Sequence, residues 1–274
     1  MQFERELSVA IDLARKAGEV IMEFYGDGAD VQWKVGNEPV TDADKAANAL
    51  IVERLAIDFP DDGILAEETP DTKGRLSHER LWVVDPMDGT KEFIKRNGEF
   101  SVMIGLAVDG VARLGVVYQP TSRRIFYASS GAGAWLREGD GEPVALRVSE
   151  TADPSEMCVA VSRSHRSERI DAVRSALGIE REVRSGSVGL KIGLICERKC
   201  DLYIHPSPQT KQWDACAPDA IITEAGGRMT DLAGEPFVYN RRDLFNRSGI
   251  LASNGRAHDQ ILERVLEAFA AIER

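Results

Sequence analysis

Residues 81–90 read Leu-Trp-Val-Val-Asp-Pro-Met-Asp-Gly-Thr. The four apolar residues at the start are typical of a buried strand, which we expect to end at Asp85. Pro86 favours a turn there, so that Asp85 and Asp88 point toward a common place beyond the strand, together with the carbonyl oxygen of Met87. Two carboxylates and a carbonyl are hard oxygen ligands of the kind that Mg²⁺ prefers.

The two residues that follow Asp88 suit a phosphate group. Gly89 would let a phosphate approach the backbone closely, and a helix that begins at Thr90 would offer amide donors to the phosphate oxygens. The same residues are also typical of an ordinary turn, in which Asp and Thr cap a helix. The stretch alone therefore leaves two alternatives open, a metal and phosphate site or a capped turn.

Three other acidic segments could belong to the same site. Glu67 and Glu68 end a short predicted strand, and because neighbours on an extended chain point to opposite sides, at most one of them faces a metal. Asp44 lies in the first turn of a predicted helix, where Thr41 and Asp44 resemble a capping pair. Asp214 begins another predicted helix, either as its N-cap or as a metal ligand. Taken singly, each segment also fits a purely structural role.

The five acids become informative as a set. Asp44, Glu67, Asp85, Asp88 and Asp214 in one pocket would repel one another by several kcal/mol unless cations neutralise them. Two or three Mg²⁺ ions would bring the required positive charge. They would also turn an acidic pocket into a receptor for an anionic phosphate substrate.

The first half of the chain predicts an α+β layer. Apolar residues recur at helical spacing in residues 1–25 and 41–59, and Asp109-Gly110 marks a hairpin between two strand-like runs. The predicted strands are 64–66, 81–85, 101–108, 111–118, 125–128, 134–137 and 144–148. They predict an antiparallel meander that the two helices cover on one face, in an N-terminal domain of residues 1–150 that carries most of the metal ligands.

The second half alternates strands and helices, which predicts an α/β domain of residues 151–274. Strands are expected at 157–161, 202–204 and near 229 and 250. Helices are expected at 167–177, 187–197 and 215–225 and from 258 onward. This domain would carry Asp214 and the contacts to the substrate.

The composition excludes several classes of protein. The 274 residues are 43% apolar and 29% charged, which is typical of a globular protein and not of a disordered one. The net charge of −11, without a run of basic residues, predicts no nucleic-acid partner. No apolar run is long enough for a membrane span, and the charged N-terminal segment is unlike a signal peptide, so a cytoplasmic location is expected. The four cysteines lack metal or redox spacing and are expected to be buried free thiols.

These motifs resemble the inositol monophosphatase superfamily of lithium-sensitive, magnesium-dependent phosphatases. The resemblance rests on Glu67-Glu68, on residues 85–90, and on Trp213-Asp214 with the later Gly226-Gly227. It implies a layered αβαβα sandwich of the sugar-phosphatase type. It also implies roles for single residues, with Asp44 and Thr90 acting on the attacking water, and with metal ligands at Glu67, Asp85, Met87 (carbonyl), Asp88 and Asp214.

Within the superfamily, residues 90–100 and 207–218 resemble the 3'(2'),5'-bisphosphate nucleotidases, which serve sulfur metabolism. This branch removes the 3'-phosphate of adenosine 3',5'-bisphosphate (PAP) or its sulfated form (PAPS). The segment Ser162-Arg-Ser-His165 resembles its nucleotide contact, and Lys191 a phosphate or ribose contact, although residues 187–191 depart from the usual Gly-Ser-Ser-Leu-Lys. The substrate contacts implied are Gly89, Thr90, Ser162, His165, Ser187 and Lys191.

The reaction that the resemblance implies is direct attack of a metal-activated water, without a phospho-enzyme. One Mg²⁺ would be held by Glu67, Asp85 and Met87, a second by Asp85, Asp88 and Asp214, and a third more weakly. Two alternatives stay open: a phosphatase of the same superfamily for inositol 1-phosphate or fructose 1,6-bisphosphate, or a non-catalytic metal or nucleotide sensor. Family members are commonly dimers, so a homodimer is a possible assembly.

Overall fold

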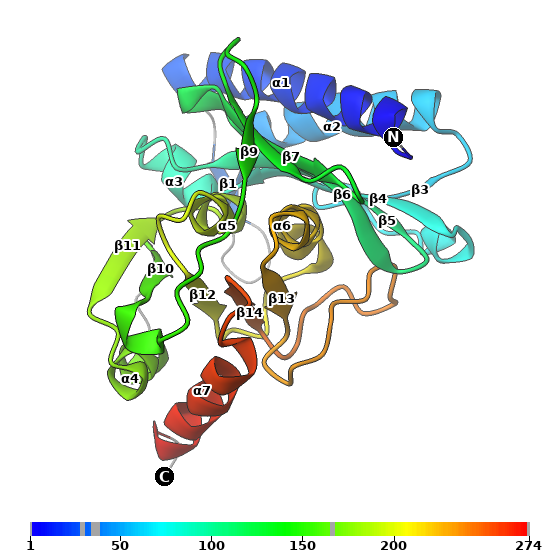
Figure 1. The fold of residues 1–274 in the computed structure, drawn as a ribbon. Coiled ribbons are helices and arrows are strands. Elements are labelled where there is room, and N and C mark those ends of the chain that lie inside the picture. Colours follow the sequence, from blue (N-terminus) through cyan, green and yellow to red (C-terminus); the bar gives the residue numbers. More distant parts are fainter. Residues whose placement is uncertain (1, 28–30, 34–38, 165–167, 273–274) are drawn as a thin grey trace.

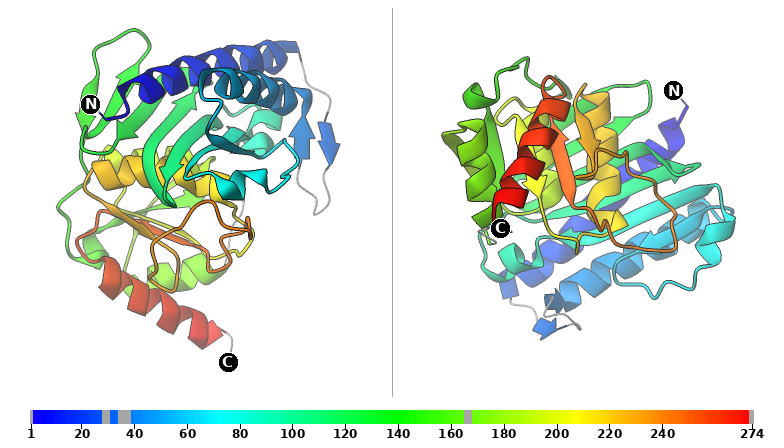
Figure 2. Two further views of the ribbon diagram at one scale, coloured as in Figure 1. Left: turned by 90° about the vertical axis from the view of Figure 1, so that its right-hand side faces the viewer. Right: turned by 90° about the horizontal axis from the view of Figure 1, so that it is seen from below.

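The protein folds into five layers, as the computed structural model shows for residues 2–27, 31–33, 39–164 and 168–272. Helices α1 and α2 cover a seven-stranded sheet, α5 and α6 lie between that sheet and a five-stranded one, and α4 and α7 cover the outer face of the second sheet (Figure 1). The predicted αβαβα sandwich is therefore confirmed. Figure 2 shows that the cover helices lie on opposite outer sides of the molecule.

The seven-stranded sheet is the predicted meander, because its strands lie side by side in chain order. Only β3 and β4 run parallel. Its strands are β3 (Gly63–Ala66), β4 (Arg80–Asp88), β5 (Ser101–Val108), β6 (Val111–Gln119), β7 (Arg124–Ser129), β8 (Ala134–Glu138) and β9 (Val144–Leu146). Along β5, Val102 and Ile104 contact the outer helices α1 (Glu4–Asp27) and α2 (Asp42–Asp58), while Met103 faces the central layer. This alternation buries both faces of the sheet.

The central layer consists of α5 (Val188–Cys196) and α6 (Gln212–Glu224). Two glycines that pair across β5 and β6, Gly105 and Gly115, let α6 lie directly on the sheet. A Cβ at Gly115 would lie 2.2 Å from the carbonyl oxygen of Ala217, and one at Gly105 would lie 2.7 Å from the Sγ of Cys216. These two glycines therefore set the distance between the sheet and α6, the helix that carries Asp214.

The five-stranded sheet is mixed, in the order β11-β10-β12-β14-β13. Its strands are β10 (Cys158–Ser162), β11 (Arg181–Ser185), β12 (Leu202–His205), β13 (Arg228–Thr230) and β14 (Ile250–Ser253). The outer helices are α4 (Glu168–Leu177) and α7 (His258–Ile272). The sequence did not predict β11, because this edge strand reads Arg-Glu-Val-Arg-Ser and has a single apolar residue.

Short elements complete the described structure. A hairpin of β1 (Val31–Trp33) and β2 (Pro39–Thr41) precedes α2, and helix α3 (Thr90–Ile94) begins where the sequence allowed a helix. Three 3₁₀ turns are η1 (Gly74–Ser77), η2 (Pro120–Ser122) and η3 (Pro154–Glu156). Among the helices that the structure describes, none has the length and apolar character needed to cross a membrane.

The four cysteines are buried and form no disulfide, as predicted. The chain passes from the seven-stranded to the five-stranded sheet between Leu146 and Cys158. The division into domains of residues 1–150 and 151–274 stays a prediction.

Candidate active site

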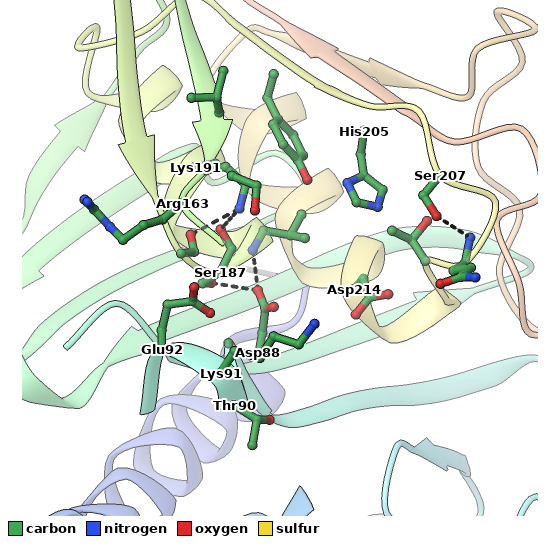
Figure 3. A pocket seen from close by; sticks show the side chains of 18 of the residues that line it. Asp88, Thr90, Lys91, Glu92, Arg163, Ser187, Lys191, His205, Ser207 and Asp214 are labelled. Atoms are coloured by element: carbon green, nitrogen blue, oxygen red, sulfur yellow. Dashed lines mark hydrogen bonds between the residues drawn. The ribbon is translucent and has the colours of Figure 1, made fainter. Parts of the chain in front are cut away.

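One cavity of about 460 Å³ gathers most of the predicted site residues. Its lining includes Glu67, Asp85, Met87, Asp88, Gly89, Thr90, Ser162, Ser187, Lys191 and Asp214. Asp44 is buried and accepts a hydrogen bond from Thr90 Oγ1. His165 lies outside the described residues. The cavity therefore combines side chains from both halves of the chain (Figure 3).

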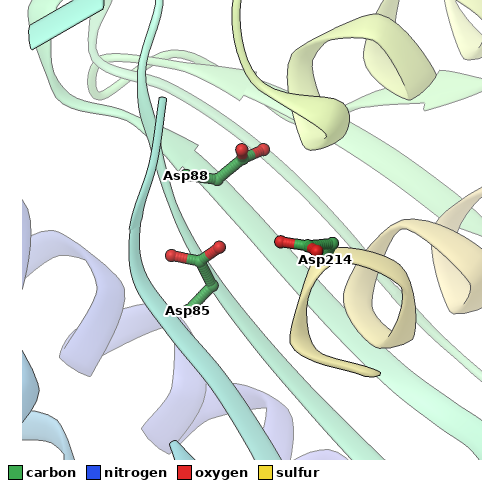
Figure 4. A group of neighbouring side chains, drawn as sticks. All are labelled: Asp85, Asp88 and Asp214. Atoms are coloured by element: carbon green, nitrogen blue, oxygen red, sulfur yellow. The ribbon is translucent and has the colours of Figure 1, made fainter. Parts of the chain in front are cut away.

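Three carboxylates converge in this cavity. Asp85, Asp88 and Asp214 each offer an oxygen atom, and these atoms lie within 4.8 Å of one another (Figure 4). The expectation that the strand ends at Asp85 is wrong: β4 continues to Asp88, which pairs with Ser101 across a shift in register. Such a bulge lets both aspartates of one strand face the same cavity, although their spacing in a regular strand would direct them to opposite faces.

Each of these carboxylates has one oxygen held by the protein. Asp85 Oδ1 accepts from the backbone N–H of Met87 at 3.0 Å. Asp88 Oδ2 accepts from Ser187 Oγ at 2.7 Å and from the backbone N–H groups of Val188 and Gly189. A carboxylate fixed through one oxygen can still offer the other to a metal ion, in a defined direction.

Asp214 is held in a way that the sequence did not predict. It is not the N-cap of its helix, because α6 begins at Gln212 and its cap is Lys211. Asp214 is the third residue of α6, and its Oδ2 reaches back to accept from the backbone N–H of Lys211 at 2.6 Å. The helix thereby gains a capping contact, and the carboxylate gains a fixed orientation.

Asp44 occupies the same position in α2, which confirms the predicted capping pair. Its Oδ2 accepts from the backbone N–H of Thr41 at 2.7 Å and from Thr41 Oγ1 at 2.6 Å. Its Oδ1 lies 3.1 Å from Thr90 Oγ1, which is also 3.3 Å from the carbonyl oxygen of Met87. The Thr90 hydroxyl therefore lies between a buried carboxylate and one of the predicted metal ligands.

The electrostatics of the cluster favour bound cations. Burial raises the pKa of Asp85 well above its ordinary value, and the charges of Glu67, Asp88 and Asp214 raise it further. Burial likewise raises the pKa of Asp214 well above its usual range and that of Asp44 to about 6. Burial and mutual repulsion disfavour the ionised form of these carboxyl groups. A divalent cation bound between them stabilises the ionised form. The donors are all hard oxygens, so the residues present fit Mg²⁺.

Gly89 and Lys191 each have a clear structural role. Gly89 has a φ of +101°, and a Cβ there would lie 3.0 Å from the carbonyl oxygen of Glu99, so the position requires glycine. The ammonium of Lys191 donates to the carbonyl oxygens of Gly186 and Ser187, at 3.2 and 2.7 Å. Burial lowers the pKa of Lys191 to about 8, although the negative charge of Asp88 opposes this shift. Contact of Lys191 and Ser187 with substrate stays a prediction.

The sequence did not single out several other side chains of the cavity. Glu92 is buried there and accepts from Ser164 Oγ, although Lys-Glu-Phe looks like an exposed helical turn. Tyr203 and His205 come from the end of β12, and Lys211 from the loop before α6. The sequence could have indicated Tyr203 and His205, because β12 ends just before the segment 207–218, which carries the predicted metal ligand Asp214.

A five-layer αβαβα fold with a cavity that can hold divalent cations defines the class of this protein. Residues 3–270 match the model of the inositol monophosphatase family. The chain therefore belongs to this family of phosphatases, and the predicted class of enzyme is confirmed.

Individual relatives show the same likeness. The chain is 39% identical over 251 residues to the 3'(2'),5'-bisphosphate nucleotidase CysQ of Escherichia coli O157:H7, covering 90% of this chain and 99% of the relative. It is 32% identical to a fructose-1,6-bisphosphatase/inositol-1-monophosphatase of Thermotoga maritima, covering 97% and 98% of the two chains. The crystal structure of CysQ from Bacteroides thetaiotaomicron matches with a TM-score of 0.78 at 33% identity, covering 92% of this chain and 98% of that one.

Proposed function

We propose that this protein is a magnesium-dependent 3'(2'),5'-bisphosphate nucleotidase that removes the 3'-phosphate of PAP. The observation that carries the proposal is the convergence of Asp85, Asp88 and Asp214, from two halves of the chain, in one cavity. A volume of about 460 Å³ is in the range of small-molecule sites. The likeness to the CysQ relatives supports the choice of substrate.

The cavity residues divide into two metal sites. Glu67, Asp85 and the carbonyl of Met87 would hold one Mg²⁺, and Asp85, Asp88 and Asp214 would hold a second. When bound, such ions stabilise the charge of a phosphoryl group and lower the pKa of water. A third ion and its ligands stay a prediction.

Asp44 and Thr90 are placed to move a proton. Because the Thr90 hydroxyl donates to Asp44, its oxygen lone pairs can accept a proton from a water molecule in the cavity. The Thr90 proton would then pass to Asp44 Oδ1. Burial supports this role, since it raises the pKa of Asp44 to about 6 and so makes the carboxylate a better base near neutral pH.

The lining of the cavity offers positive charge to a substrate with a second phosphate. Its basic side chains include Arg163, Arg184 and Lys211. Cationic side chains form charge-assisted hydrogen bonds with phosphate oxygens. Inositol 1-phosphate lacks a second phosphate, so this lining favours PAP over that alternative.

The test is phosphate release from PAP, PAPS, inositol 1-phosphate and fructose 1,6-bisphosphate in Mg²⁺. We expect the highest kcat/KM with PAP, and inhibition by added Li⁺ or Ca²⁺. A higher kcat/KM with inositol 1-phosphate or fructose 1,6-bisphosphate would favour the activity named for the Thermotoga maritima relative. Nucleotide binding without any phosphate release would favour a sensor. A homodimer and a cytoplasmic location stay predictions.

A further inference from the structure

The backbone turn Gly186–Ser187, just before α5, has an unusual conformation. Ser187 has a φ of +47°, which residues with a side chain rarely adopt. Gly186 has no room for a side chain, because a Cβ there would lie 2.2 Å from the carbonyl oxygen of Glu99. The surrounding residues must therefore hold this turn in place.

Two charged side chains hold the turn. Glu99 Oε2 accepts from the backbone N–H of Gly186 at 2.7 Å. Lys191 donates to the carbonyl oxygens of Gly186 and Ser187, and Figure 3 shows Lys191 beside Ser187 in the cavity. The single N–H of Gly186 and both carbonyls of the turn thus have a charged partner.

The turn and the first two residues of α5, which follow it directly, hold Asp88. Ser187 Oγ and the N–H groups of Val188 and Gly189 all donate to the same oxygen of Asp88. The position of the turn therefore sets the direction of the Asp88 carboxylate toward Asp85 and Asp214. A movement of the turn would move a carboxylate of the proposed metal site.

Glu99 is itself firmly placed. Its backbone N–H donates to Asn97 Oδ1 at 3.0 Å, and the preceding carbonyl of Gly98 accepts from Gln119 Nε2 at 2.8 Å. Arg163 forms a two-pronged ion pair with the carboxylate, with both contacts at 2.6 Å. The segment of Gly98 and Glu99 therefore connects the end of β6 to the turn.

We propose that Glu99 is a positioning residue of the active site: by accepting from Gly186 it fixes the turn, and through the turn it fixes Asp88 for metal binding. Glu99 lies outside the lining of the cavity and touches none of the three aspartates of the cluster in the described structure. The inference rests on the proposed function, because it assumes that Asp88 is a metal ligand. It adds a residue of the loop before β5 to the machinery of the site.

The test is calorimetric titration of Mn²⁺ into the metal-stripped full chain, with the Mg²⁺ dependence of phosphate release as a second readout. Glu99→Ala removes the acceptor for Gly186, so we expect Mn²⁺ affinity to fall about tenfold or more, as for other groups that orient metal ligands. Glu99→Gln keeps an oxygen for Gly186. Arg163→Gln removes the ion pair with Glu99 and the contact of Arg163 with the carbonyl oxygen of Arg184, but it leaves the acceptor of Gly186 in place. Both should stay within about threefold of the wild type.

Two further variants separate positioning from general damage. Glu138→Ala removes an exposed glutamate at the end of β8 that pairs with Arg124, and should leave Mn²⁺ binding unchanged. Ser187→Ala removes one of the three donors to Asp88, together with the cap that Ser187 Oγ gives to Leu190 at the start of α5, and leaves the two backbone donors, so it should weaken binding by a smaller factor. Combined with Glu99→Ala, it should weaken binding by less than the product of the two single effects, because both act on the same carboxylate.

The outcomes are distinct. If the wild type binds Mn²⁺ and Glu99→Ala binds it equally well, the inference fails while the proposed function stands. An equal loss in Arg163→Gln would also overturn it, since the contacts of Arg163 with Glu99 and Arg184, and not the contact of Glu99 with Gly186, would then matter. The inference would also fail if the loss of Mn²⁺ affinity in the Glu99→Ala, Ser187→Ala double variant equalled the product of the two single losses. If the wild type binds no Mn²⁺, the proposed function fails and takes the inference with it.

Discussion

The two halves of the chain contribute to the active site in different ways. The seven-stranded sheet contributes carboxylates from its strand ends, because Glu67 follows β3 and Asp85 and Asp88 lie at the end of β4. The second half of the chain brings Asp214 from the first turn of α6, and it holds Asp88 with the first amides of α5. The difference teaches that the first half supplies most of the carboxylates, while the second half supplies Asp214 and the helix starts that orient Asp88 and Asp214.

The strongest way to test this comparison is to neutralise one carboxylate from each half. Asp88→Asn and Asp214→Asn keep the size of the side chain but remove a charge from the proposed metal site. We expect each to lower kcat/KM for PAP by at least about a hundredfold, in line with the loss of a transition-state interaction of several kcal/mol. Phosphate release in Mg²⁺ is the measurement. Retention of more than about a tenth of the activity by either variant would exclude its ligand role.

A second prediction concerns the stability of the half with the five-stranded sheet. His258 is buried at the start of α7 between Ser253 Oγ and Thr230 Oγ1, at 2.8 and 2.9 Å. Burial lowers the pKa of His258 to about 4, from 6.5. The unfolded chain therefore binds more protons between these values, and the free energy of unfolding falls as the pH drops from about 6.5 to 4.

The expected loss is roughly 3 kcal/mol over this pH window. Urea unfolding of wild type and His258→Gln between pH 7 and pH 4 checks it. The variant should be less stable at pH 7 but should lose less stability on acidification. Parallel pH profiles for the two proteins would show that His258 does not titrate as described. The difference between the profiles is the useful quantity, because burial also raises the pKa of Asp219 to about 6, which acts in the opposite sense.

The smallest expected effect concerns the contact between the halves. Gly115→Ala would place a Cβ against the backbone of Ala217, so that α6 must move away from the sheet. Overpacking of this kind costs about 1 to 3 kcal/mol. We expect a lower unfolding midpoint in urea and, because α6 carries Asp214, a weaker apparent affinity for Mg²⁺. Gly26→Ala, near the end of α1, is the control, since its backbone is not in the left-handed region and nothing lies within 4 Å of an added Cβ there. A stable Gly115→Ala variant would mean that α6 can shift without cost.

The sequence predicted the first sheet better than the second. In the meander β3 to β9, chain order equals spatial order, so turn signals such as Asp109-Gly110 were sufficient. In the five-stranded sheet the order β11-β10-β12-β14-β13 depends on contacts between distant segments. The edge strand β11 lacked an apolar pattern, because much of it faces solvent.

The site could be predicted as a set of residue types but not as a set of contacts. Each of the five acids belonged to a local pattern, and the resemblance to a family joined those patterns. The bulge after Asp85, the position of Asp214 within its helix and the contact of Glu99 with Gly186 depend on tertiary packing. No spacing in the chain expresses them.

The burial of every cysteine has a practical consequence. Cys158, Cys196, Cys200 and Cys216 are each at most 6% exposed, and burial raises the pKa of Cys196 and Cys216 above their usual range. Thiol reagents attack the thiolate, so the native chain should react slowly with maleimides. A pair of cysteines introduced at exposed positions on the two outer helix layers would accept fluorescent dyes selectively. Energy transfer between such dyes would report whether the two halves move together during turnover.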